Sequence, residues 1–109
     1  MCKRGDIILV PFPLTDLSSA KVRPALVLSP KKEKSLDMIV CFISSQLDSA
    51  NAHTVRIDPK PSNGLKVASL VRFDKIATLD RRIALGVIGS LSADWLISKK
   101  KEFLSVFGF

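Results

Sequence analysis

Short apolar stretches bounded by Pro, Ser, Asp and Lys occupy the first two-thirds of the chain. They are rich in Val, Ile and Leu and are too short for typical helices, which is characteristic of strands. The pattern predicts strands over residues 6–12, 24–29, 37–44, 53–57 (the weakest), 68–79 and 83–91. A segment dense in turn-forming residues, 58–64, separates two of them. Strands at such close spacing favour a small β-barrel.

The last part of the chain has a different period. Ser92 is a suitable N-cap, and Asp94 falls in the first turn, where the helix dipole favours a carboxylate. Apolar residues then recur at helical spacing, at positions 96, 97, 103, 104 and 107, and lysines 99–101 fall on the polar side. The sequence therefore predicts a mainly β fold with one C-terminal helix over residues 93–107, docked on a sheet.

Length and composition support one folded domain, residues 1–109, because 47% of the residues are hydrophobic and 25% are charged. No apolar run approaches the roughly 18 residues of a membrane span. The chain opens without an apolar signal segment, so we expect a cytoplasmic protein. Cys2 and Cys41 are too few for a disulfide framework or a closed zinc site, and His53 is the single histidine. We therefore expect neither a metal nor a cofactor.

Net charge is the first indication of a partner. Seventeen Lys and Arg residues against ten Asp and Glu give +7 and a pI near 9.8. Such a balance attracts phosphate backbones, although it also serves solubility alone. The chain has no tyrosine and one tryptophan, which argues against a stacking platform for single-stranded nucleic acid.

The segment 70–75 contains the most informative pair of charges. Side chains alternate along a strand, so Val71 and Phe73 are expected in the core, with Arg72 and Asp74 together on the other face. In one interpretation Asp74 is a general base and Arg72 stabilises a phosphate. In the other, the two form an ion pair of little energetic consequence, and the spacing alone favours this second interpretation.

Two further places offer polar groups at strand ends. Pro24 keeps Arg23 extended at a strand entrance, where its guanidinium suits bidentate phosphate binding, close to Lys21. Residues 43–46 read Ile-Ser-Ser-Gln, so Ser44 or Gln46 is placed either to bind a substrate or to form a turn. No histidine is close in sequence to activate a serine, which argues against a catalytic triad.

These segments resemble the MazF/PemK family of toxin endoribonucleases, including its Kid-like branch. The likeness is carried by five blocks in the family's order, at residues 3–7, 23–27, 43–46, 69–75 with 78–80, and 89–92. Each block is weak alone, but together they cover nearly the whole chain. The resemblance implies an SH3-like barrel with a C-terminal helix, a homodimer, and metal-independent cleavage of single-stranded RNA.

The resemblance also implies site residues. Arg23 matches the family's principal catalytic arginine, and Ser44 stands where a threonine is common, which keeps the hydroxyl. Arg72 and Asp74 match the acid–base pair of the Kid-like branch. That branch's first-loop histidine has no counterpart between Pro13 and Val22. The residues expected to contact RNA are Lys21, Gln46 and Lys75.

The implied reaction is attack of the RNA's 2′-hydroxyl on the adjacent phosphate. Arginine is a poor base because its pKa exceeds about 12. We therefore favour Asp74 as the base, Arg23 and Arg72 as charge stabilisers, and Ser44 as a phosphate ligand; the alternative makes Arg23 the acid–base group. The expected partners are mRNA, an acidic antitoxin and a second copy of the chain. Rival functions are a non-catalytic inhibitor on the same fold, like the gyrase-poisoning CcdB relatives, and a decayed member that only binds RNA or antitoxin.

Overall fold

The computed structural model describes residues 2–12, 21–30 and 34–109. The strands are β1 (Asp6–Phe12), β2 (Lys21–Val27), β3 (Asp37–Ser44), β4 (Thr54–Ile57), β5 (Ser69–Asp80) and β6 (Gly86–Ser90). The helices are the short 3₁₀ turns η1 (Leu47–Ser49) and η2 (Arg81–Ile83), followed by α1 (Ala93–Ser98) and α2 (Lys100–Ser105). None of these helices is long and apolar enough to cross a membrane.

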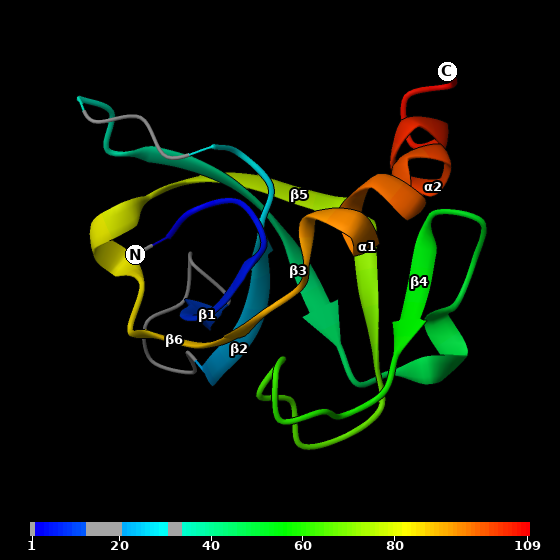
Figure 1. The fold of residues 1–109 in the computed structure, drawn as a ribbon, viewed down its shortest axis with the longest axis horizontal. Helices are drawn as coiled ribbons and strands as arrows, with labels where there is room; N and C mark the ends of the chain where they lie inside the picture. The colour runs from blue at the N-terminus through cyan, green and yellow to red at the C-terminus, as the bar shows by residue number, and fades with distance from the viewer. Residues whose placement is uncertain (1, 13–20, 31–33) are drawn as a thin grey trace.

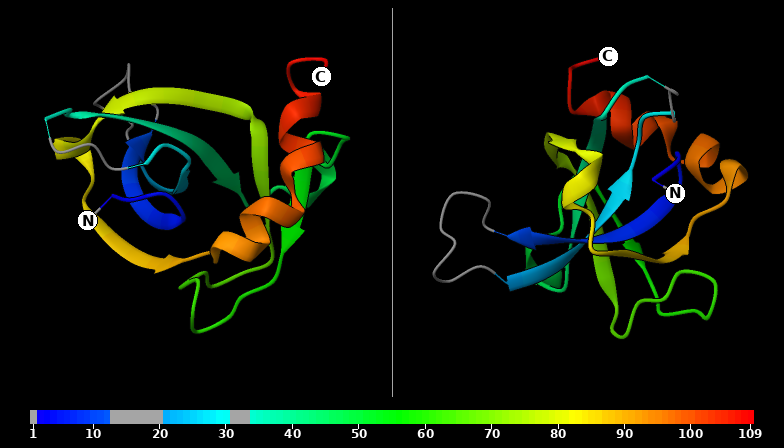
Figure 2. Two further views of the ribbon diagram at one scale, coloured as in Figure 1. Left: turned by 45° about the horizontal axis from the view of Figure 1, so that its top comes forward. Right: turned by 90° about the vertical axis from the view of Figure 1, so that its left-hand side faces the viewer.

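All six strands belong to one antiparallel sheet in the order β4-β5-β3-β2-β1-β6. The sheet curls strongly, as Figures 1 and 2 show, and α2 stands beside β4 and β5. The predicted mainly β fold is confirmed, and this curled antiparallel sheet forms the expected small barrel.

Both faces of the central strands are buried, which explains why their sequences are almost continuously apolar. On one face, Ile8, Val27 and Val40 belong to a cluster that includes Met38 and Leu79. On the other face, a second cluster includes the following buried residues: Ile7, Leu26, Cys41, Ile43, Val71 and Phe73. Trp95, Leu96 and Phe103 of the helices pack on this second cluster. The predicted burial of Val71 and Phe73 is therefore confirmed.

Strand boundaries differ most from the prediction in β2, which also ends two residues early at Val27, and in β6, whereas those of β4 and β5 differ by single residues. β2 begins at Lys21 rather than at residue 24, so Arg23 lies within the strand and not at its entrance. Residues 21–24 pair only with β1, since pairing with β3 starts at Ala25. Pro24 is tolerated there because its missing N–H faces an unpaired strand edge. β6 is shorter than expected because Asp80 accepts the N–H of Arg82 and starts η2 instead.

The expected single C-terminal helix is wrong. Ser92 does cap α1, its hydroxyl accepting the N–H of Trp95 at 3.1 Å. The helix breaks at Lys99 (φ −106°, ψ 12°), whose N–H bonds to Leu96 three residues earlier. The break lets α2 turn so that Phe103 packs edge-to-face on Phe73, with 5.6 Å between ring centroids.

Gly5 shows why the first strand needs a glycine before it. Its φ is +94°, its carbonyl accepts the N–H of Leu91, and a Cβ there would lie 2.6 Å from the Leu91 oxygen. A close approach of two chain segments at positive φ favours glycine. Gly5 therefore allows the tight entry of the chain into β1.

Candidate active site

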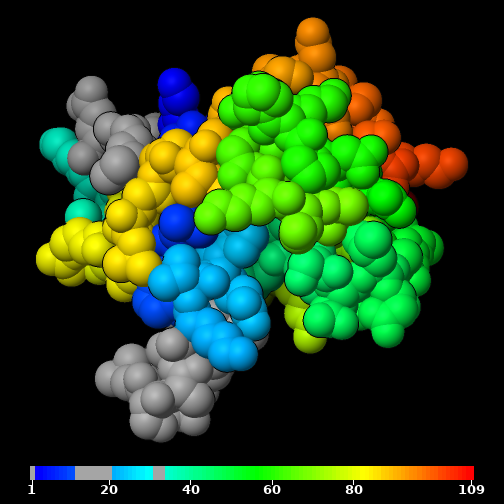
Figure 3. All heavy atoms as spheres, turned by 90° about the horizontal axis from the view of Figure 1, so that it is seen from below, coloured from blue at the N-terminus to red at the C-terminus, as the bar shows by residue number. Residues whose placement is uncertain are grey.

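A groove of about 730 Å³ opens between β2, the end of β3 and the segment before β5. Figure 3 shows this face, with the light-blue atoms of β2 opposite the green atoms of the segments that follow β3 and precede β5. Five of the seven predicted site residues line it: Arg23, Ser44, Gln46, Arg72 and Lys75. The other two, Lys21 and Asp74, are not part of its lining.

Arg23 reaches the groove because of the open edge of β2. It pairs with Val10 of β1 on one side, and β3 has not yet begun to pair on the other side. The side chain is exposed, and no carboxylate in the described parts of the chain forms an ion pair with it. Lys21 lies two residues earlier on the same face of β2 and is also exposed, at the outer end of the strand.

The end of β3 supplies hydroxyl and amide groups to the groove. The Ser44 hydroxyl accepts the N–H of Gln46 at 3.1 Å, so the turn that the sequence allowed does form. The hydroxyl hydrogen of Ser44 remains able to donate, since accepting this bond uses only a lone pair. Ser44, Ser45 and Gln46 all line the groove, so this segment is at once a turn and a part of the site.

An irregularity in β5 determines which side chains face the groove. Phe42 of β3 pairs with Arg72, yet the preceding residue, Cys41, pairs with Ile76, so residues 73–75 are inserted into β5. Such bulges bend a strand and re-aim its side chains. Arg72 and Lys75 consequently line the same groove, although strict alternation places them on opposite faces.

Arg72 and Asp74 form a bidentate ion pair. Nε of Arg72 donates to Oδ1 of Asp74 at 3.1 Å, and its second nitrogen donates to Oδ2 at 2.8 Å. The side chains are 19% and 22% exposed. The hydrogen bonds from Arg72, assisted by one from Asn51, lower the pKa of Asp74, and the same pair raises the pKa of Arg72. The expected juxtaposition is confirmed, and the two residues are each other's partners.

The charged side chains that line the groove favour binding of an anion. Its lining includes four cationic side chains, Arg23, Lys66, Arg72 and Lys75, and no carboxylate among the described residues. Sequence reasoning missed Lys66, which follows the turn at Gly64. A Cβ at Gly64 would overlap the backbone of Ile88, so glycine allows this loop to lie against β6. Nothing in the local sequence of Lys66 indicates that placement.

Other chemistry has little support in the described ranges. No three His, Cys, Asp or Glu side chains there come together in a way that could hold a metal ion. Burial raises the pKa of the Cys41 thiol, which keeps it protonated and makes it a poor nucleophile. The groove thus offers guanidinium, ammonium and hydroxyl groups, and the Asp74 carboxylate lies outside its lining, held against Arg72.

The comparison with protein families identifies the chain's relatives. A family described as the PemK-like, MazF-like toxin of type II toxin–antitoxin systems matches residues 3–103. The chain belongs to this toxin family. No curated protein sequence matches it.

Solved structures of the toxin's relatives share its fold. MazF-mt6 of Mycobacterium tuberculosis superposes with a TM-score of 0.70 at 24% identity, covering 94% of this chain and 95% of that one. MazF from Deinococcus radiodurans gives 0.72 at 23% identity, covering 98% and 96%. A mycobacterial endoribonuclease in complex with its cognate antitoxin gives 0.75 at 16% identity, covering 98% and 95%. At these identities the likeness shows the fold alone.

The toxin departs from the pattern that the resemblance implies at one residue of the family's site and in the first loop of the Kid-like branch. Ser44 takes the place of the common threonine and is partly buried, lining the groove. The segment 13–20, in which no histidine matches that branch, lies outside the described residues.

Proposed function

We propose that this toxin is a sequence-specific endoribonuclease that cleaves single-stranded RNA, including mRNA, without a metal ion or cofactor. One observation carries the proposal: Arg23, Arg72 and the Ser44 hydroxyl converge on one groove whose described lining is cationic. A phosphodiester bound there meets two guanidinium groups, which suit the planar, bidentate recognition of phosphate.

The proposed reaction is an internal transesterification. The 2′-oxygen of the RNA attacks the adjacent phosphorus, and the bond from phosphorus to the 5′-oxygen breaks. A base takes the 2′-hydroxyl proton, and an acid returns a proton to the leaving 5′-oxygen. The products are a 2′,3′-cyclic phosphate and a 5′-hydroxyl, so neither water nor an external nucleophile is consumed.

The residues take separate roles in this reaction. Arg23 and Arg72 stabilise the negative charge that develops on the phosphorane, and one of them assists the leaving group. Ser44 donates to a phosphate oxygen. Gln46, Lys75 and Lys21 hold the flanking nucleotides. The groove lining supports these roles for all but Lys21, which lies further along β2.

Asp74 is the proposed base, and its contacts define what kind of base it is. Both of its oxygens accept hydrogen bonds from Arg72, so it is ionised but of low proton affinity. A carboxylate oxygen has two lone pairs, so Asp74 can take the proton while Arg72 stays bound, and the ion pair weakens as its charge is neutralised. The competing assignment, Arg23 as the acid–base group, requires instead a guanidinium that loses a proton, against a pKa above about 12.

The decisive experiment incubates the purified protein with a long RNA in the presence of EDTA and maps the cut ends. We expect cleavage to persist in EDTA and to leave 5′-hydroxyl ends at a short recurring sequence. A substrate with hydrogen in place of the scissile 2′-hydroxyl should remain intact. Efficient cutting of the deoxy substrate would contradict the mechanism, and absence of any cut would favour a non-catalytic inhibitor or RNA-binding protein.

The proposed partners follow from the surface and from the relatives. The mycobacterial relative is solved with its cognate antitoxin and the Deinococcus relative as a MazE–MazF complex, which supports an antitoxin for this toxin. Ile97, Phe107 and Phe109 of the C-terminal segment are exposed by 71%, 54% and 88%, which supports a homodimer that covers them. Light scattering that finds only the 11.9 kDa monomer at micromolar concentration would contradict the dimer. We place the toxin in the cytoplasm, with its RNA.

A further inference from the structure

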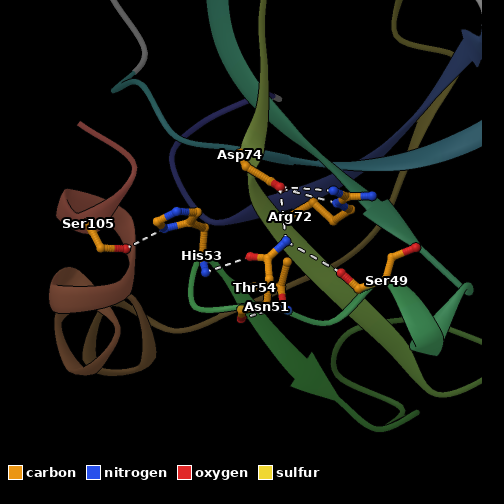
Figure 4. A network of polar contacts seen from close by, with 7 residues as sticks. All are labelled: Ser49, Asn51, His53, Thr54, Arg72, Asp74 and Ser105. Atoms are coloured by element: carbon orange, nitrogen blue, oxygen red, sulfur yellow. Dashed lines mark hydrogen bonds and ion pairs between the residues drawn. The ribbon is translucent and has the colours of Figure 1, made fainter. Parts of the chain in front are cut away.

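A chain of polar contacts runs from α2 to the Arg72–Asp74 pair, and no role in the proposed reaction accounts for it. Nδ1 of the His53 ring lies 2.7 Å from the Ser105 hydroxyl. The backbone N–H of His53 donates to the side-chain oxygen of Asn51, also at 2.7 Å. Nδ2 of Asn51 then donates to Oδ2 of Asp74 at 3.3 Å. Figure 4 shows these residues in sequence, from the helix on one side to the ion pair on the other.

The orientation of the Asn51 amide follows from its neighbours. A backbone N–H can only donate, so the amide oxygen must face His53. The amide nitrogen consequently faces Asp74, a carboxylate that accepts. The same nitrogen also donates to the Ser49 carbonyl at 3.4 Å. Asn51 therefore holds Oδ2, the atom of Asp74 that also accepts from Arg72.

The turn that presents Asn51 is tied to the sheet at both ends. The Asn51 N–H donates to the Thr54 hydroxyl at 2.9 Å, and that hydroxyl donates back to the Asn51 carbonyl at 3.0 Å. The N–H of Phe73, between Arg72 and Asp74, donates to the His53 carbonyl at 3.1 Å. This bond falls where β5 is irregular and lacks pairing with β3, so the turn supports the strand at its bend.

The contact with α2 has a definite direction. Ser105 gives its only hydroxyl hydrogen to the Glu102 carbonyl, at 2.6 Å. Since a hydroxyl has one hydrogen, Nδ1 of His53 must carry a proton and donate to the Ser105 oxygen. This bond fixes the ring of His53 against the helix.

We propose that Asn51 is a positioning residue that acts on Arg72 through Asp74, and that α2 holds Asn51 in place through His53 and Ser105. The side chains of Arg72 and Asp74 are partly exposed. The bonds between them hold the two groups together but leave the pair free to move as a whole. The third bond, from Asn51, fixes the pair as a unit and so fixes the guanidinium at the groove. A displacement of about 1 Å at such a group can cost about a hundredfold in rate.

The rate arm of the test rests on the proposed RNA cleavage. Asn51→Asp keeps an oxygen for the His53 N–H and the shape of the turn, but it replaces the donor to Asp74 by a carboxylate oxygen. Ala52→Asp is the matched control, because it adds the same charge to the same exposed turn and leaves Asn51 in place. We expect Asn51→Asp to lower kcat about tenfold relative to Ala52→Asp, with similar KM. Equal kcat values in the two variants would overturn the proposal.

A second arm needs no RNA. NMR titration of Asp74 and the signal of the Arg72 Nε–H report the pair directly. Losing the donor and placing a carboxylate against Oδ2 should both raise the pKa of Asp74 and shift the Arg72 signal in Asn51→Asp but not in Ala52→Asp. If the pKa of Asp74 and the Arg72 Nε–H signal are the same in both variants as in the parent, Asn51 does not act on the pair. If the pair responds while the parent never cuts RNA, the positioning stands and the proposed function fails.

The helix arm compares two serines. Ser105→Ala and Ser98→Ala each remove a hydroxyl that donates to the carbonyl three residues earlier at 2.6 Å, but only Ser105 meets His53. We expect Ser105→Ala alone to shift the Arg72 Nε–H signal and to lower kcat a few-fold. Identical spectra for Ser105→Ala and Ser98→Ala would show that α2 does not support the site.

Discussion

At the scale of single residues, the two arginines of the groove differ in what holds them. Arg72 is fixed by a bidentate bond to Asp74, whereas Arg23 has no carboxylate partner in the described ranges. An unpaired guanidinium can give all its donors to a phosphate, and a paired one brings precise placement. In the proposed reaction, Arg23 therefore mainly stabilises the negative charge of the substrate, and Arg72 mainly fixes the position of the phosphate.

Replacement of Arg23 tests that division. Arg23→Ala should lower kcat/KM for RNA cleavage by about a hundredfold or more, as expected when a preorganised donor to the developing charge is lost. The melting temperature should stay within error of the parent, because the side chain is exposed and pairs with no described carboxylate. Arg56→Ala is the control, since it removes an exposed arginine paired with Asp58 outside the groove lining. Equal losses in both variants would indicate general electrostatics instead of a site at Arg23.

The lowered pKa of Asp74 predicts how the cleavage rate depends on pH. Its pKa lies below the usual 3.8, so the ionised form that pairs with Arg72 persists down to that acidity. The contribution of the pair to stability is present above the unfolded pKa and is lost only as pH falls through the folded value. Cleavage that depends on ionised Asp74 should therefore stay level from about pH 8 to 5.

The variant Asp74→Asn completes this test. It retains the shape of the side chain and removes both the charge and the proton acceptor, so we expect a large loss of kcat at neutral pH. A parental rate in this variant would show that Asp74 is not the base, and it would also contradict the positioning of Arg72 through the ion pair. A steep fall in the parent's rate between about pH 7 and 5 would assign the base to a group of higher pKa.

At the scale of elements, the sequence predicts strands well where both faces are buried. β1 and β3 match their predicted ranges because continuous apolar runs are bounded by Pro, Asp and Ser. The start of β2 was missed because Lys21, Val22 and Arg23 are exposed and pair with one neighbour only, so their polarity resembles a loop. The helix break at Lys99 depends on packing of Phe103 against Phe73, a contact between distant segments that helical periodicity does not encode.

The same limits apply to the site. Alternation along β5 correctly places Arg72 and Asp74 together, because both follow the period of the strand. It cannot place Lys75, whose direction depends on the three inserted residues opposite β3. Asn51 and His53 were also missed: their roles come from a turn that meets β5 and α2 only in the folded chain. Residue types and motifs identified most of the groove, and tertiary contacts determined the rest.

At the scale of the molecule, charge connects the fold to its regulation. The net charge of +7 and the cationic groove attract any flexible polyanion, whether RNA or an acidic peptide. A toxin with the proposed RNA-cleaving activity must be silenced, and an acidic segment that folds along the groove would do so by occupying the phosphate positions. Its carboxylates would pair with Arg23, Arg72 and, at the outer end of β2, Lys21.

This model predicts competition and salt dependence. An uncleavable RNA analogue, with 2′-deoxy nucleotides at the scissile positions, is titrated against the preformed toxin–antitoxin complex. RNA affinity should fall in proportion to the antitoxin present, since both ligands need the same guanidinium groups. Antitoxin affinity should fall steeply as salt is added, because exposed charge pairs are screened over about 8 Å at physiological ionic strength.

The Arg23→Ala variant provides the internal control for this competition. It should weaken the binding of both the RNA analogue and the antitoxin. Arg56→Ala, outside the groove lining, should leave both affinities nearly unchanged. If RNA and antitoxin bind the parent at the same time without loss of affinity, the groove is not the antitoxin's site. Inhibition would then have to act through another surface, and the apolar groove of about 680 Å³ between the helices and the sheet, lined by Phe73, Leu96 and Phe103, would be the next place to test.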